Sequence, residues 1–154
     1  MRQWRGYRWT GSALAQDAGP TSFKTSSHGV TLNSVALRLQ PDSGNGTRTA
    51  LLTLTVRNGG SAAVRDVTVV VYIDGDTMAQ AGDCPAVAED WFRVNQCTAG
   101  TLAPGASKTF TLRYTIPAYM AAELTVPTVT PAGYVFLNLG DQHAAQADLP
   151  RATT

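Results

Sequence analysis

The segment A-L-L-T-L-T-V-R-N-G-G-S-A-A-V-R-D-V-T-V-V-V-Y-I-D, residues 50–74, decides the fold. Residues 52–56 alternate leucine or valine with threonine, and residues 67–73 alternate valine or isoleucine with Thr, Val and Tyr. A period of two in β-branched residues is typical of strands that bury one face. Residues 58–61, N-G-G-S, tolerate positive φ and so allow a turn between the two strands. The segment therefore predicts an all-β fold.

Other segments extend the same pattern. The clearest strand is T-F-T-L-R-Y-T-I, residues 109–116, which Pro117 ends. Residues 30–39 alternate apolar and other residues, and a slip in this alternation at Asn33-Ser34 indicates a β-bulge. Asn45-Gly46 favours a tight hairpin turn. Shorter strands are expected at 124–126 and 134–139, and helix only as a turn at 118–122.

Six or seven short strands without a helical period predict a two-sheet antiparallel β-sandwich of about seven strands. We divide the chain into an irregular N-terminal arm (1–27), the sandwich (28–140) and a flexible C-terminal tail (141–154). Thr53, Thr55 and Thr68 are expected to face outward. The predicted core consists of the aliphatic and aromatic residues of the opposite phase: Leu52, Leu54, Val56, Val69, Val71, Phe110, Leu112 and Tyr114.

Composition excludes several functional classes. A chain of 154 residues suits one domain with tails, and its 15% of charged residues is low. The net charge of +1 gives no field that would favour nucleic acid. No apolar run is long enough to span a membrane, and residues 1–16 lack the apolar core of a signal peptide.

Catalytic motifs are absent from the sequence. His28 and His143 each lie in a polar segment without a partner, which predicts solvated loop positions. No Gly-x-Ser-x-Gly, His-Glu-x-x-His or Gly-x-Gly-x-x-Gly pattern occurs. Gly100 and Gly105 have the spacing of a phosphate loop, but Lys108 comes too late and a strand follows instead of a helix. The sequence therefore predicts a protein that is not an enzyme and holds no cofactor.

Two segments resemble a known family. Residues 56–76, V-R-N-G-G-S-A-A-V-R-D-V-T-V-V-V-Y-I-D-G-D, resemble the turn and following strand of bacterial Ig-like surface repeats. These repeats include the cell adhesion related domain found in bacteria and the domain of unknown function 11. Residues 100–110, G-T-L-A-P-G-A-S-K-T-F, look like their second signature. The resemblance covers roughly 45–117 and implies an Ig-like sandwich that serves as a spacer, stalk or adhesive domain in exported proteins. Such repeats usually come in tandem, whereas this chain has no internal repeat.

Cys84 and Cys97 are the only two cysteines. Their spacing does not match a zinc site. The resemblance implies that they form a disulfide, because such repeats often carry a cysteine pair in this region; two unpaired thiols are the alternative. A disulfide would indicate an oxidising compartment, and hence an extracellular or cell-surface location.

Residues 74–92, on both sides of Cys84, form an acidic segment. This segment contains no Lys or Arg, which is typical of a solvated acidic loop. A calcium site is the alternative, since hard cations prefer several oxygen ligands. Its candidate ligands are Asp74, Asp76, Asp83, Glu89 and Asp90.

The N-terminal arm interleaves basic and aromatic residues. Such a pattern can bind ligands by stacking, but exposed tryptophans favour an arm that docks on its own sandwich or on a neighbouring copy. The interaction surface that we predict combines these residues with an aromatic pair after the first cysteine: Arg2, Trp4, Arg5, Tyr7, Arg8, Trp9, Trp91 and Phe92.

Together these features predict a non-enzymatic exported module with a structural or adhesive role at the cell surface. The first alternative is a subunit of a repeating assembly (a filament, an appendage or a virion decoration) joined through its arm. The second is a carbohydrate-binding module that uses Trp91, Phe92 and nearby acids. The expected partner is a protein or a second copy of the chain, with carbohydrate as the alternative and no nucleic acid.

Overall fold

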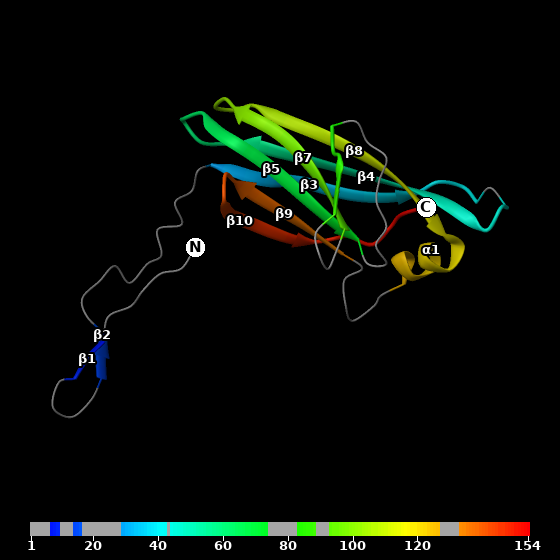
Figure 1. The fold of residues 1–154 in the computed structure, drawn as a ribbon, viewed down its shortest axis with the longest axis horizontal. Coiled ribbons are helices and arrows are strands. Elements are labelled where there is room, and N and C mark those ends of the chain that lie inside the picture. The colour runs from blue at the N-terminus through cyan, green and yellow to red at the C-terminus, as the bar shows by residue number, and fades with distance from the viewer. Residues whose placement is uncertain are drawn as a thin grey trace.

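The computed structural model describes residues 7–9, 14–16, 29–42, 44–73, 83–88, 93–126 and 133–154, the first two ranges by their backbone alone. Strands dominate this part of the chain (Figure 1). The elements are β1 (Tyr7–Trp9), β2 (Leu14–Gln16), β3 (Val30–Leu39), β4 (Thr47–Asn58), β5 (Val64–Ile73), β6 (Ala86–Ala88), β7 (Arg93–Leu102), β8 (Ser107–Pro117), α1 (Ala118–Thr125), β9 (Gly133–Leu139) and β10 (Gln142–Asp148). No helix in these ranges is long and apolar enough to cross a membrane.

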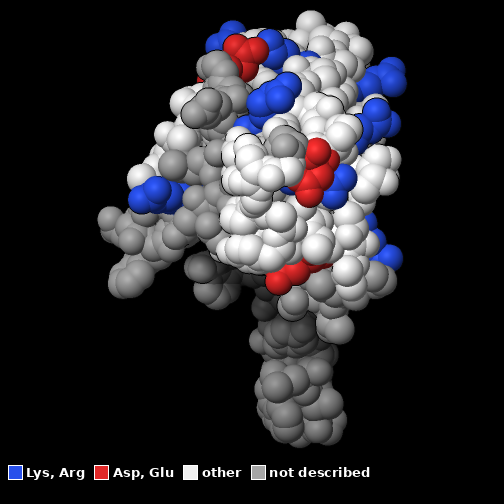
Figure 2. Space-filling model, turned by 90° about the vertical axis from the view of Figure 1, so that its right-hand side faces the viewer, with Lys and Arg blue, Asp and Glu red and all other residues white. Residues whose placement is uncertain are grey.

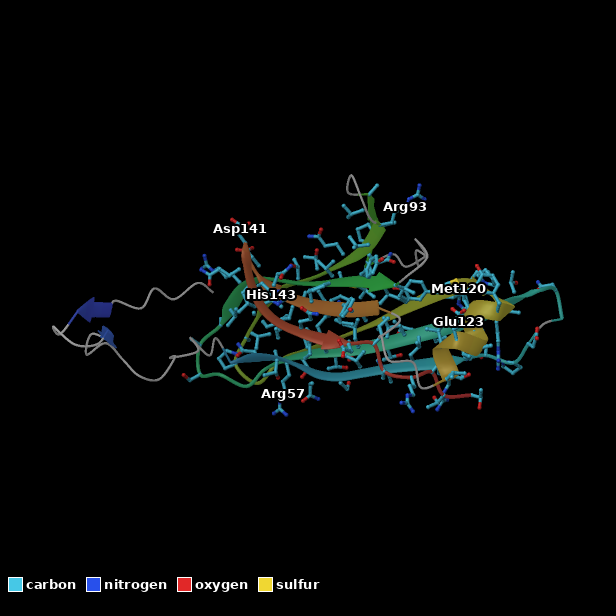
Figure 3. All side chains as sticks on the ribbon, turned by 90° about the horizontal axis from the view of Figure 1, so that it is seen from below. Arg57, Arg93, Met120, Glu123, Asp141 and His143 are labelled. Atoms are coloured by element: carbon cyan, nitrogen blue, oxygen red, sulfur yellow. A yellow bond between two sulfur atoms is a disulfide. The ribbon has the colours of Figure 1, made fainter. Side chains whose placement is uncertain are left out.

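The strands form two antiparallel sheets that pack as a sandwich. One sheet has the order β3-β4-β8 and the other β10-β9-β5-β7-β6, while β1 pairs only with β2. β3, β4 and β8 correspond to strands A, B and E of an Ig-like sandwich, and β5, β9 and β10 to strands C, F and G. Figure 3 shows the two layers from below, with α1 at one end. The predicted all-β, two-sheet, Ig-like fold is confirmed.

The segment of residues 50–74 crosses from one sheet to the other. β4 is the central strand of the three-stranded sheet, whereas β5 is central to the five-stranded sheet. The buried faces of the two strands therefore lie on opposite sides of one core. The sequence suggests that the glycines of residues 58–61 allow a turn with positive φ, but neither Gly59 nor Gly60 has a positive φ. Asn58 instead holds this crossing in place by hydrogen bonds from its side chain.

The predicted core is confirmed. All eight of the expected core residues are buried, with Leu52, Leu54 and Leu112 each 0% exposed. Thr53, Thr55 and Thr68 lie on the outer faces and are half-buried by their strand neighbours. The register of β3 against β4 shifts between Leu32 and Ser34, which confirms the bulge.

The region after β8 differs from the sequence prediction. Residues 118–125 form the helix α1, so the strand expected at 124–126 is wrong. Pro117 precedes the first helical residue, where its missing N–H costs nothing, and the following A-Y-M-A-A-E-L consists mainly of good helix formers. Ala121 and Leu124, three positions apart, share one face of the helix and are buried against the core.

The C-terminal segment also differs from the flexible tail that the sequence predicts. Residues 142–148 form β10, which pairs with β9. Beyond β10, Thr153 lies beside β3: its carbonyl oxygen accepts from the Leu39 N–H at 2.7 Å, and its N–H donates to the Leu37 carbonyl at 2.9 Å. Leu149 and Ala152 are buried. An alanine- and glutamine-rich strand gives little sequence signal, because its pairing depends on the free edge of β9 rather than on its own propensity.

Tyr114 buries a hydroxyl group without a partner. The residue is 0% exposed, and its Oη forms no hydrogen bond with any residue that the structure describes. Loss of water around the hydroxyl raises its pKa above the ordinary value of 10.0. The tyrosine ring therefore contributes to the core while its hydroxyl weakens the fold.

We expect Tyr114→Phe to be as stable as the parent protein at pH 7, or more stable by about 1 kcal/mol, because the change removes an unsatisfied polar group. Above pH 10 the unfolded chain releases the Tyr114 proton while the folded chain keeps it, so the parent protein loses stability as pH rises. The variant lacks this loss. Denaturant melts at pH 7 and above pH 10 measure both effects. A variant that is less stable by more than about 1 kcal/mol at pH 7 would show that the hydroxyl has a partner in solution.

Candidate functional site

Most of the interaction and calcium residues predicted from the sequence lie outside the described ranges. This holds for Arg2, Trp4, Arg5, Asp74, Asp76, Glu89, Asp90, Trp91 and Phe92. Tyr7, Arg8 and Trp9 form β1, which pairs with β2. The hypothesis that the arm joins copies of the chain therefore stays a prediction.

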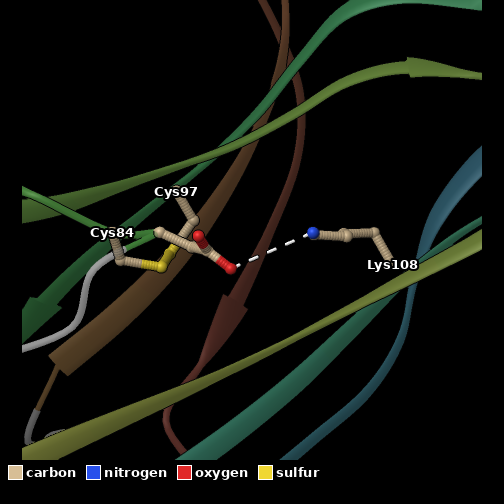
Figure 4. A network of polar contacts seen from close by, with 4 residues as sticks. Cys84, Cys97 and Lys108 are labelled. Atoms are coloured by element: carbon tan, nitrogen blue, oxygen red, sulfur yellow. Dashed lines mark ion pairs between the residues drawn. A yellow bond between two sulfur atoms is a disulfide. The ribbon is translucent and has the colours of Figure 1, made fainter.

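The disulfide between Cys84 and Cys97 is confirmed, with both sulfurs buried (Figure 4). Cys97 belongs to β7, and Cys84 lies just before β6, the edge strand that pairs with β7. The Asn95 side-chain amide donates to the Cys84 carbonyl at 2.9 Å. This hydrogen bond holds the start of β6 against β7 from inside the sandwich. Closing a loop of this size stabilises a fold by about 3 kcal/mol through the unfolded state. The disulfide thus anchors the outermost strand of the five-stranded sheet.

Asp83 is the one calcium candidate that the structure describes. Its side chain is 78% exposed, and one carboxylate oxygen lies 4.0 Å from the Lys108 ammonium group (Figure 4). Within the described ranges no three His, Cys, Asp or Glu residues lie close enough together to hold a metal ion. The calcium alternative rests on residues outside those ranges and stays a hypothesis.

The outer face of the five-stranded sheet carries a cluster of aromatic rings. Tyr72 of β5 pairs directly with Tyr134 of β9, and Val70 pairs with Phe136. The ring centres of Tyr134 and Phe136 are 6.1 Å apart. Phe136 also meets the His143 ring of β10 edge-on, at 5.7 Å between ring centres. Three neighbouring strands thereby bring these rings onto one surface.

Gly133 permits the close pairing behind this cluster. It is the first residue of β9 and pairs with Ile73. A Cβ atom at Gly133 would clash with the carbonyl oxygen of Tyr72 and with the Leu149 side chain. The absence of a side chain lets β9 approach β5 where Tyr134 and Tyr72 lie side by side.

Amide groups surround the rings. Gln96 of β7 pairs with Val70, and Gln146 of β10 pairs with Phe136. The two amides therefore stand at the two ends of the row that contains Val70 and Phe136. We call this surface the aromatic face and define it by its outward residues Val70, Tyr72, Gln96, Tyr134, Phe136, His143 and Gln146. Its only neighbouring carboxylate in the same rows is Asp148, at the end of β10. The surface therefore combines apolar rings with uncharged hydrogen-bonding groups.

Sequence reasoning missed the aromatic face, although a signal was present. In V-V-V-Y (69–72) and Y-V-F-L (134–137) both phases of the strand are apolar, whereas a half-exposed strand usually has one polar phase. The inward phase of each segment fills the core, as expected. The outward phase is also apolar, which core packing does not explain, and it supplies Tyr72, Tyr134 and Phe136.

Comparison with solved structures finds matches of low similarity. A chitin-binding domain, ChBD2 from Thermococcus kodakarensis KOD1, is 16% identical, with a TM-score of 0.41 over 76% of this chain and 98% of that domain. A GH20 exo-β-N-acetylglucosaminidase from Vibrio harveyi, solved with N-acetylglucosamine, is 11% identical with a TM-score of 0.40. That match covers 77% of this chain and 17% of the enzyme. No curated protein matches the chain significantly.

A family model gives the clearest match. The CARDB model, which describes the cell adhesion related domain found in bacteria, aligns with residues 32–132, well over half of the 154 residues. The aligned region runs from β3 through the disulfide, β8 and α1. It includes both segments whose resemblance the sequence suggests. CARDB is an adhesion-related family without catalytic function. The chain belongs to the CARDB family of bacterial adhesion-related domains.

Proposed function

We propose that this protein is a non-enzymatic, exported adhesive module that binds carbohydrate through its aromatic face. The observation that carries the proposal is the outward cluster of Tyr72, Tyr134 and Phe136 on the paired strands β5 and β9. Membership of an adhesion-related family supports a binding role. The buried disulfide supports export, because disulfides persist in oxidising compartments.

The chemistry of the face fits a sugar polymer. A pyranose ring presents apolar C–H groups on its two faces and hydroxyl groups around its rim. Rings such as Phe136 and Tyr134 can cover the apolar faces, while Gln96, Gln146 and the imidazole of His143 can bond to the hydroxyl groups. Ligand sites generally combine aromatic contact with a few polar groups in this way. A sheet surface suits an extended chain better than a small molecule.

The low charge of the face favours a neutral polymer. Every residue that defines the aromatic face lacks a formal charge when His143 is neutral. A charged ligand would lose its water there without gaining an opposite charge, which is costly. We therefore expect cellulose or chitin, both uncharged and insoluble, to be suitable probes.

Replacing Phe136 with alanine is expected to weaken binding to such a polymer by about tenfold or more, because a central stacking ring is lost. Depletion of the full chain from solution by cellulose and by chitin measures the affinity. Melting of each variant confirms that it is folded.

Leu51→Ala is the matched control, since Leu51 is an outward, half-buried aliphatic residue of the other sheet. The control should bind like the parent protein. Equal affinity of the Phe136 variant and the parent protein would overturn the role of the aromatic face. Failure of the parent protein to bind any neutral polysaccharide would overturn the carbohydrate proposal.

A further inference from the structure

The outer face of the three-stranded sheet has a different chemistry. Leu51 and Ala36 are among its outward residues, but most are threonines and arginines: Thr49, Thr53, Thr55, Arg57, Thr109, Thr111, Arg113, Thr115 and, from β3, Arg38. We call this surface the threonine–arginine face. The three strands contain no Asp or Glu at any position, in contrast to their five Lys and Arg residues: Arg38, Arg48, Arg57, Lys108 and Arg113.

Strand pairing places two of the arginines in one row. Arg38 pairs with Leu51, and Leu51 pairs with Arg113 on its other side. Neighbouring strands lie about 4.8 Å apart, so the backbones of the two arginines are about 10 Å apart across the sheet. The Leu51 side chain between them is shorter than an arginine side chain, so it does not block a ligand from reaching both guanidinium groups. Arg57 extends the same surface at the far end of β4, where Figure 3 shows it pointing away from the sandwich.

Hydroxyl groups fill the rows beside the arginines. Thr53 pairs with Thr111 and Thr55 with Thr109, and the hydroxyl oxygens of the second pair are 2.9 Å apart. Each threonine hydroxyl can donate one hydrogen bond and accept others. The face is therefore a flat array of hydroxyl groups with a positive charge at three points.

The arginines of this face have no ion-pair partner among the residues that the structure describes. Arg38, Arg57 and Arg113 are all exposed. Figure 2, which views the molecule from the α1 end, shows Lys and Arg side chains along its right-hand margin, where no Asp or Glu is visible, and further Lys and Arg side chains at its top and left. An anionic partner would meet attraction here without repulsion from a carboxylate side chain of these three strands.

We propose that the threonine–arginine face binds an acidic polysaccharide. The planar guanidinium groups of Arg38 and Arg113 match carboxylate and sulfate groups in shape and charge, and threonine hydroxyls match the hydroxyl groups between them. Nucleic acid fits less well, because the phosphate backbone requires a denser row of cations and this face offers no ring on which a base could stack.

The location of this face adds a role that the proposed function does not include. The two sheets turn their outer faces in opposite directions (Figure 3). One module can therefore hold an acidic polymer on one side while the aromatic face holds a neutral polymer on the other. Such bridging is a direct physical basis for adhesion.

The double variant Arg38→Gln, Arg113→Gln of the full chain tests the proposal. We expect it to bind alginate, which carries carboxylates, and dextran sulfate about tenfold more weakly than the parent protein, with uncharged dextran as the baseline for both. Binding of the parent protein should weaken as salt is added. Affinity electrophoresis with each polymer in the gel measures these differences.

Arg65→Gln, Arg93→Gln is the matched control, because it removes two exposed arginines from the five-stranded sheet and gives the same net charge. The control should retain binding to both acidic polymers, as should Phe136→Ala, which separates this proposal from that of the aromatic face. Equal losses in the two double variants would show a response to net charge alone and overturn the proposal. Failure of the parent protein to bind either acidic polymer, or equally tight binding of single-stranded DNA, would also overturn it.

Discussion

Replacing Asn58 with aspartate is expected to lower the free energy of unfolding by about 3–5 kcal/mol. The Asn58 side chain is 0% exposed. Its amide nitrogen donates to the Ala62 carbonyl at 2.8 Å and to the Leu102 carbonyl at 2.9 Å. A carboxylate has no hydrogen to donate, so the change would leave both carbonyl oxygens unsatisfied and direct a buried negative charge toward them.

The expected cost is high because Asn58 joins two turns. Its side-chain oxygen accepts from the Gly60 N–H at 2.9 Å, within the crossing from β4 to β5. Its backbone N–H donates to the Ala106 carbonyl, and its own carbonyl accepts from the Gly105 N–H, both in the turn between β7 and β8. The two segments whose sequences resemble the family thus meet at this one residue. Loss of Asn58 would loosen both turns at the same end of the sandwich.

Asn45→Asp is the matched control for this prediction. Asn45 lies in an exposed hairpin turn, where its side-chain oxygen accepts from the backbone N–H and the hydroxyl group of Thr47. A carboxylate can accept the same two hydrogen bonds, so we expect a change within about 0.5 kcal/mol. Denaturant melts of the three proteins give the comparison. If both variants lost the same stability, the special role assigned to Asn58 would be wrong.

Leu54→Ala is expected to destabilise the protein by about 2–5 kcal/mol. Leu54 is 0% exposed and lies in the middle of β4, between Val35 of β3 and Phe110 of β8. Because β4 is the central strand, both neighbouring strands are held by backbone hydrogen bonds and cannot easily move into the space that the smaller side chain leaves. The resulting cavity adds to the lost burial of apolar surface.

Thr55→Ala, one position along the same strand, tests the opposite face. Thr55 points outward, where its hydroxyl group exchanges a hydrogen bond with Thr109 in contact with water. We expect its loss to cost well under about 1 kcal/mol. The midpoint of urea unfolding, read with an unchanged slope, gives the difference. Similar costs at the two positions would contradict the assignment of inward and outward faces.

The amino-acid sequence by itself determined the strands and the face of each strand that enters the core. Leu54 faces inward and Thr55 outward because successive side chains of a strand point to opposite sides, so a period of two in the sequence becomes a two-sided strand. The bulge before Ser34 follows from the same local rule. The disulfide of Cys84 and Cys97 was predictable through resemblance to a family.

Only the tertiary structure decided which strands lie together. The sequence allows β4 and β5 to form a hairpin or to cross between sheets, because both arrangements bury the same residues; hydrogen bonds from Asn58 to a distant turn select the crossing. The strand β10 has little propensity of its own and exists because β9 offers an open edge. Pairing between distant segments likewise brings Tyr72 to Tyr134 and aligns Arg38 with Arg113. Local alternation fixes the side of a strand on which a residue lies, whereas hydrogen bonds between strands far apart in the chain fix its neighbours, and both candidate binding faces are made of such neighbours.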